Sequence, residues 1–146
     1  MKPLHLMLIE EHAAVRRALE VRLSSSSAVA KIDTFADVPS ALQMFVPLNP
    51  DIVVLGLDSG RAMSMRQKME AVTRLSAKNT PVIVLVPYID DLERELLLRA
   101  GVYCYCLKNI NTPQLLKEIE QTVRQHRNNS ASFSIRSHQP AISGAT

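Results

Sequence analysis

A continuous aliphatic run, Ile52-Val53-Val54-Leu55, lies between Pro50-Asp51 and Gly56, and it constrains the fold more than any other stretch of the chain. A run of this length between turn-forming residues is typical of a strand that is buried on both faces. Such strands occur in parallel sheets that helices cover on both sides. In open sheets of this kind the ligand lies beyond the carboxyl ends of the strands, so we expect the functional site near residues 56–58.

The remaining sequence alternates short apolar runs with amphipathic segments. Besides the central run, strands are expected at 4–9, 29–34, 81–86 and 102–107. Helices are expected at 12–24, at 62–77, from just after Pro87-Tyr88 to Ala100, and from Thr112 to 126. A further helix is expected to begin at 37 or 39 and to stop before Pro47. Five strands that alternate with five helices predict a doubly wound α/β fold with a five-stranded parallel sheet. Thr112 is expected to cap the last helix, with Pro113 at its first position.

Residues 127–146 are rich in Asn, Ser, His, Pro and Gly and show no amphipathic period. We interpret this segment as a disordered tail or the stub of a linker, which leaves residues 1–126 as the domain. A chain of 146 residues with 47% hydrophobic content is large enough for one domain with its own core.

The composition limits the partners and the compartment. The chain has 17 Lys and Arg against 14 Asp and Glu, a near balance that gives no general case for nucleic acid or an anionic membrane as partner. No signal-peptide pattern opens the chain and no apolar run approaches the roughly 18 residues that span a bilayer, so we expect a soluble, cytoplasmic protein. Cys104 and Cys106 are expected on one face of a strand, as small buried side chains in a reducing compartment rather than as a disulfide.

Polar residues follow the predicted strands at the edge where a site is expected. Glu10-Glu11 ends the first strand and Lys108 the fifth, whereas Gly56 and Val86 end the third and fourth. Further features in order are Val15-Arg16-Arg17-Ala18-Leu19, Pro81-Val82-Ile83-Val84-Leu85, Ala100-Gly101, Tyr105 and Thr112-Pro113-Gln114-Leu115-Leu116. Over residues 4–126 this ordered set resembles the receiver domain of two-component response regulators, and it is most similar to the subgroup that carries a helix-turn-helix output domain.

The resemblance implies a phosphorylation site and shows where this chain departs from it. In the family a histidine kinase phosphorylates an aspartate at the end of the third strand, two acids after the first strand bind Mg²⁺, and a hydroxyl residue and a lysine contact the phosphoryl group. Glu10 and Glu11 match the metal acids and Lys108 matches the lysine. Gly56 replaces the phosphoacceptor aspartate and Val86 replaces the hydroxyl residue. Tyr105 matches the aromatic residue that moves with that hydroxyl, so its partner is expected to be missing.

We therefore expect a degenerate pseudo-receiver that is not an enzyme and has no cofactor. Mg²⁺ binding at Glu10 and Glu11 should be weak or absent, because the cation retains only part of its oxygen ligands. Lys108 is expected to pair with Glu10 or Glu11, with the glutamate reaching into the space above Gly56.

With phosphorylation lost, the surface is expected to carry the function. The resemblance implies a protein-binding or homodimer face on the fourth predicted helix, the fifth strand and the last helix, with no direct contact to nucleic acid or membrane. Its expected residues are Asp90, Asp91, Glu93, Arg94, Arg99 and Tyr105. The third predicted helix, with Arg66, Lys68, Arg74 and Lys78 against Glu70, should present the most basic solvent face.

Two alternatives remain open. Asp58, two residues after Gly56, faces the same side by strand parity and could act as a displaced phosphoacceptor in a transcription regulator. A small flavodoxin-like enzyme or nucleotide binder would need a glycine-rich phosphate loop, and the four glycines form no such pattern. The histidines, His5, His12, His126 and His138, show no metal-ligand spacing.

Overall fold

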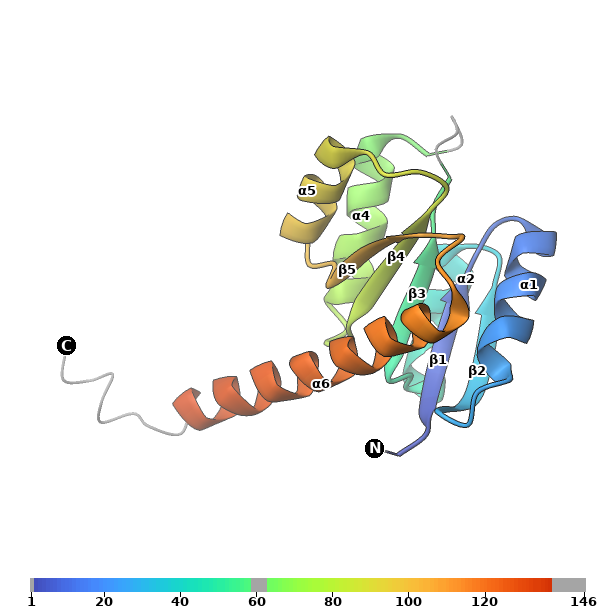
Figure 1. Ribbon diagram of the computed structural model, residues 1–146. Helices are drawn as coiled ribbons and strands as arrows, with labels where there is room; N and C mark the ends of the chain where they lie inside the picture. Colours follow the sequence, from blue (N-terminus) through green and yellow to red (C-terminus); the bar gives the residue numbers. More distant parts are fainter. Residues whose placement is uncertain (1, 59–62, 138–146) are drawn as a thin grey trace.

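The computed structural model describes residues 2–58 and 63–137 and shows one parallel sheet with helices on both faces (Figure 1). The strands are β1 (Leu4–Ile9), β2 (Val29–Phe35), β3 (Ile52–Gly56), β4 (Val82–Val86) and β5 (Cys104–Leu107), in the order β2-β1-β3-β4-β5. The helices are α1 (Ala13–Ser24), α2 (Val38–Gln43), α3 (Phe45–Leu48), α4 (Met65–Ser76), α5 (Asp91–Arg99) and α6 (Thr112–Ser137). The predicted doubly wound, five-stranded α/β fold is confirmed.

Alternate residues of the central strands build two separate cores. In β3, Ile52 and Val54 face the cluster beneath α1 and α6, whereas Val53 and Leu55 face the cluster beneath α2, α3, α4 and α5. All four side chains are at most 2% exposed. Burying each aliphatic side chain of this size contributes roughly 1.5–3 kcal/mol. The prediction that the Ile52-to-Leu55 run is buried on both faces is confirmed, and neighbouring residues of one strand lie on opposite faces of the sheet.

The segment after β2 forms two helices rather than the one predicted. Asp37 caps α2 through the Ser40 amide, and the chain starts again as the short helix α3 after Met44. The prediction that the helix stops before Pro47 is wrong, because Pro47 is the third residue of α3. A proline is tolerated in the first turn, where its missing N–H has no intrahelical acceptor.

Two further helix boundaries differ from the sequence-based expectation. α4 begins at Met65, because Ser64 and Gln67 form a reciprocal capping box, and the predicted start at Ala62 lies outside the described residues. α6 is capped by Asn111, whose Oδ1 accepts a hydrogen bond of 2.8 Å from the Gln114 amide, so Thr112 is the first helical residue and not the cap.

The last helix is longer than predicted. α6 continues to Ser137, so the expectation of disorder is wrong for residues 127–137, while residues 138–146 lie outside the described part of the chain. Figure 1 shows the C-terminal part of α6 extending past the sheet. Helix hydrogen bonds are local, and residues 127–137 contain neither proline nor glycine. The lack of an apolar period indicated an unpacked segment, and it did not exclude a helix.

Arg22 connects α1 to the loop between β5 and α6. Its Nε donates to Thr112 Oγ1 at 3.0 Å, and its guanidinium also donates to the carbonyl oxygens of Lys108, at 3.3 Å, and Ile110. These bonds fix the backbone of the loop that carries Lys108. Within residues 2–58 and 63–137, no helix combines the length and apolarity that crossing a membrane requires.

Replacing Arg22 tests this connection. We expect Arg22→Ala to lower the free energy of unfolding by about 2 kcal/mol, because three acceptors lose a charged donor. Arg17→Ala is the matched control, since Arg17 is an exposed arginine on the same helix, and it should change stability by less than about 0.5 kcal/mol. Urea unfolding measures both values, and equal effects of the two substitutions would contradict the role given to Arg22.

Candidate functional site

The residues predicted for the site meet at the carboxyl edge of the sheet. Glu10 follows β1, Gly56 ends β3, and Asp58 lies two residues further on. Lys108 follows β5, and its amide donates to the Val86 carbonyl at 2.7 Å, which places it beside the end of β4. In β1, β3 and β5 the even-numbered residues face α1 and α6, so by alternation these four residues continue that face.

Glu10 and Lys108 form an ion pair above Gly56. Lys108 Nζ lies 2.8 Å from Glu10 Oε1, and the two side chains are 14% and 1% exposed. A Cβ atom at position 56 would overlap Glu10 Oε1, so the carboxylate occupies the volume that a side chain there would need. The contact is ionic, because no directed hydrogen bond within the described residues reaches Oε1. The expected pairing is confirmed for Glu10, whereas Glu11 is exposed.

The other carboxylate oxygen of Glu10 is also held. Oε2 accepts a hydrogen bond of 3.0 Å from the His12 amide, and Arg16 Nη1 donates to the Glu10 carbonyl at 2.7 Å. α1 therefore begins directly beside the acid that it helps to position. A buried carboxylate that is both ion-paired and hydrogen-bonded is costly to disturb, because either charge left alone would remain desolvated.

Asp58 belongs to the same cluster through His12. His12 Nε2 bonds to Asp58 Oδ2, and Asp58 Oδ1 lies 3.7 Å from Lys108 Nζ. The hydrogen bond that His12 donates to Asp58, followed by the negative charge of Asp58, raises the pKa of His12. The same bond, together with Lys108, lowers the pKa of Asp58. In the sequence His12 is one of four histidines without metal-ligand spacing, and its position directly after Glu10-Glu11 is the available signal.

Position 86 offers Tyr105 no hydroxyl partner, as predicted, and Tyr105 bonds to a different residue. Val86 is 1% exposed and offers no hydroxyl, but the Tyr105 hydroxyl donates to Glu93 Oε2 on α5. Glu93 Oε1 in turn lies 2.6 Å from Lys68 Nζ on α4. Burial, followed by the hydrogen bond to Glu93, raises the pKa of Tyr105.

This contact also corrects two surface assignments. The side chains of Lys68 and Glu93 are 9% and 11% exposed, so Lys68 does not belong to the solvent face of α4 and Glu93 does not belong to an open interaction face. α5 is the fourth predicted helix, and the rest of the expected face, Asp90, Asp91, Arg94 and Arg99, is exposed on or beside it. Asp90 caps the helix through the Glu93 amide, and Arg99 pairs with Glu95 at 2.7 Å.

A cavity of about 410 Å³ opens beside Gly56, beyond the ends of β1 and β3. Glu11, Asp37 and Asp58 supply carboxylates to its lining, and the other lining residues are Ile9, Glu10, Ala36, Val38, Pro39, Leu55, Gly56, Leu57 and Met63. The Ser40 amide lowers the pKa of Asp37. Among the described residues, no group of three or more His, Cys, Asp or Glu side chains could hold a metal ion as positioned. The residues therefore do not fit an intact Mg²⁺ site: Glu10 is engaged by Lys108, and position 56 supplies no oxygen.

Comparison with known proteins identifies the class. The family model of the response regulator receiver domain matches residues 6–120. This chain therefore belongs to the response regulator receiver family, a family of signalling domains.

Its relatives are bacterial regulators. The chain is 25% identical over 119 residues to the oxygen regulatory protein NreC of Staphylococcus carnosus, covering 82% of this chain and 54% of NreC. It is 25% identical over 118 residues to the transcriptional regulatory protein LiaR of Bacillus subtilis, covering 80% and 54%. It is 26% identical over 121 residues to the response regulator protein VraR of Staphylococcus aureus, covering 81% and 56%. The chain thus spans about half the length of these relatives.

Solved structures share the fold. The signal receiver domain of the response regulator NarL from Mycobacterium tuberculosis superposes with a TM-score of 0.72 at 17% identity, covering 85% of this chain and 98% of that one. A LuxR-family two-component response regulator from Aurantimonas superposes with a TM-score of 0.70 at 19% identity, covering 84% and 86%.

The His12–Asp58 pair makes stability depend on pH. Because the pKa of His12 rises above 6.5 on folding, its contribution is complete below pH 6.5 and is lost as pH rises through the folded value. Because the pKa of Asp58 falls below 3.8, its contribution is complete above pH 3.8 and is lost as pH falls through the folded value. The melting temperature of wild type should exceed that of His12→Gln most at about pH 4–6.5, and the difference should disappear toward pH 9.

An NMR titration of the imidazole provides the control. Asp58→Asn should return the pKa of His12 toward 6.5, because Asp58 is the largest cause of the shift. An unchanged His12 titration in Asp58→Asn would contradict the pairing.

Proposed function

We propose that this chain is a phosphorylation-independent pseudo-receiver that acts as a protein–protein interaction module in signal transduction or transcriptional regulation. The observation that carries the proposal is the Glu10 carboxylate, which lies above Gly56 and is paired with Lys108. Phosphoryl transfer to a receiver needs a carboxylate nucleophile, a cation among oxygen ligands and a positive group for the developing charge. Here position 56 has no nucleophile, and Lys108 already neutralises one of the two metal acids.

The pairing also argues against a functional Mg²⁺ site. Mg²⁺ prefers near-ideal octahedral oxygen ligands and loses its water reluctantly. To bind Glu10 it would have to displace Lys108 from a side chain that is 1% exposed. Breaking a buried pair by removing one partner costs about 3–5 kcal/mol. The binding free energy of Mg²⁺ at an incomplete set of oxygen ligands does not offset this cost. We therefore propose that the domain functions without a cofactor.

A second buried ion pair fixes the opposite face of the sheet. Tyr105, Glu93 and Lys68 join β5, α5 and α4 without a hydroxyl residue at position 86. The ion pair of Glu93 and Lys68 thus holds Tyr105 inward without phosphorylation at the carboxyl edge of the sheet. In this proposal α5 and β5 present one constant surface to a partner.

The surface around the start of α5 suits a protein partner. Exposed apolar side chains gather there: Tyr88 is 58% exposed, Ile89 41% and Leu92 67%. Asp90, Asp91 and Arg94 supply charges beside them. Aromatic and aliphatic anchors within a polar rim are typical of protein interfaces. We propose a protein partner or a second copy at this face, in the cytoplasm, with no contact of this chain to nucleic acid or membrane.

Asp58 provides the observation for a second candidate. Its Oδ1 lies 3.7 Å from Lys108 Nζ and its side chain is 32% exposed, so a phosphoryl donor could approach it. In that case the domain would still be switched by phosphorylation, at a displaced acceptor. Its other oxygen is bonded to His12, which weakens Asp58 as a nucleophile. We do not propose an enzyme or nucleotide binder, because the receiver family is a signalling family.

Incubation with acetyl phosphate and Mg²⁺ separates the two candidates. We expect no phosphoryl adduct on the wild-type protein by intact-mass spectrometry, because position 56 has no carboxylate and Glu10 is engaged. A receiver domain that has an aspartate at the position of Gly56, treated in parallel, serves as the positive control for the reagent. An adduct on wild type that is absent from Asp58→Asn would establish the displaced acceptor and overturn the proposal.

A further inference from the structure

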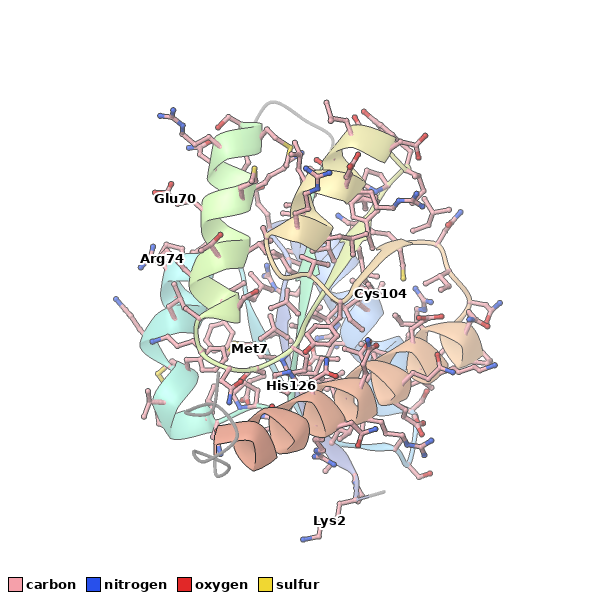
Figure 2. All side chains as sticks on the ribbon, turned by 90° about the vertical axis from the view of Figure 1, so that its left-hand side faces the viewer. Lys2, Met7, Glu70, Arg74, Cys104 and His126 are labelled. Carbon is pink, nitrogen blue, oxygen red and sulfur yellow. The ribbon has the colours of Figure 1, made fainter. Side chains whose placement is uncertain are left out.

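The two cysteines of the chain form a pair on the outer strand. Cys104 and Cys106 lie on β5, which pairs with β4 at the edge of the sheet. Their Sγ atoms are 2.9 Å apart, and both thiols are free and half-buried. Both side chains belong to the face that packs toward α6, and Figure 2 shows Cys104 between β5 and that helix. The proposed signalling role uses neither thiol.

Strand geometry opposes a direct bond between the sulfurs. Residues two apart in a strand are separated by about 6.6 Å along the chain, and their Cβ atoms have a similar spacing. A disulfide needs Cβ atoms roughly 3.5–4.5 Å apart. Closing a disulfide would therefore require β5 to buckle.

A metal ion or metalloid that binds both sulfurs needs them further apart than a disulfide does. With metal–sulfur bonds of about 2.3 Å, two sulfurs on one tetrahedral centre are about 3.8 Å apart. The thiols reach that separation from 2.9 Å by small side-chain rotations, while the backbone of β5 stays extended. We propose that Cys104 and Cys106 form a dithiol site that binds a thiophilic ion or metalloid through two sulfurs. Monovalent copper and trivalent arsenic belong to this chemical class, because soft thiolates select soft centres.

The surroundings of the two thiols limit the number of ligands. Glu118 on α6 accepts from Cys104 at 3.4 Å and is itself held by Gln114 at 3.1 Å. Among the described residues no group of three His, Cys, Asp or Glu side chains is arranged as a metal site. This favours a two-sulfur centre over a four-coordinate zinc.

The position of the site gives it a route to the proposed interaction face. Tyr105 lies between the two cysteines, and its side chain points to the other face of β5, where it bonds to Glu93 on α5. A centre that changes the spacing of Cys104 and Cys106 therefore acts on the residue that connects β5 to α5. This consequence rests on the proposed function, whereas the binding itself does not.

Phenylarsine oxide is the first probe. Two thiols react with it to form two As–S bonds, and the arsenic-bound oxygen leaves as water with the two thiol protons, so nothing is oxidised or reduced. We expect a single adduct by intact mass that resists excess monothiol and is released by a dithiol. Cys104→Ser and Cys106→Ser each retain one thiol, and their adducts should be lost in the same monothiol. Wild-type protein without an adduct, or variants that keep theirs in monothiol, would overturn the site.

Monovalent copper, titrated against a competing colorimetric chelator, is the second probe. Wild type should bind one equivalent, and each serine variant should bind about 100-fold more weakly or worse, because the second sulfur acts at high effective concentration. Circular dichroism melts of the variants separate loss of the site from loss of the fold, and Glu118→Gln should retain binding. Equal copper affinity in all variants would contradict the proposal. Phosphoryl labelling decides the pseudo-receiver proposal separately.

Discussion

The ion pair between Glu10 and Lys108 occupies the space above Gly56 at the carboxyl edge of the sheet. In a sheet of this kind the carboxyl ends of the strands converge, and here an acid from the first strand and a lysine from the fifth meet above a glycine from the third. Two opposite charges in a volume almost closed to water stabilise one another only while both are present. Gly56 leaves room for this pair, because any side chain at position 56 would overlap the Glu10 carboxylate. The glycine at position 56 and the length of the Glu10 side chain therefore depend on one another.

The alternation of side chains along the strands separates this pair from the second buried ion pair. Even-numbered residues place Glu10, Gly56 and Lys108 toward α1 and α6, and odd-numbered Tyr105 faces α5. Lys68 and Glu93 supply the charges on that side and hold Tyr105 inward. Each face of the sheet thus has its own ion pair, and neither requires an added phosphoryl group. This arrangement is consistent with a domain that presents a constant surface.

The sequence predicted the sheet well because hydrophobic periodicity reports burial directly. Ile52 to Leu55 could be placed at the centre, and Glu10, Gly56 and Lys108 at one edge, because strand ends converge. The Glu93–Tyr105 contact could not be predicted, because Glu93 looks like any acid in the first turn of a helix. The continuation of α6 to Ser137 was missed because residues 127–137 show no apolar period in the sequence. His12 was missed because its partner, Asp58, lies 46 positions away.

A Mg²⁺ titration followed by amide NMR tests the central claim most directly, with wild type, Gly56→Asp and the double variant Glu10→Asp/Gly56→Asp. We expect no shifts in wild type at millimolar Mg²⁺, because Glu10 is paired with Lys108. Gly56→Asp alone should fold less stably and bind little, because its side chain overlaps the Glu10 carboxylate. The shorter acid of the double variant makes room for both carboxylates and should restore binding. Saturable shifts around Glu10 in wild type, or equal Mg²⁺ affinity in Gly56→Asp and the double variant, would contradict the account.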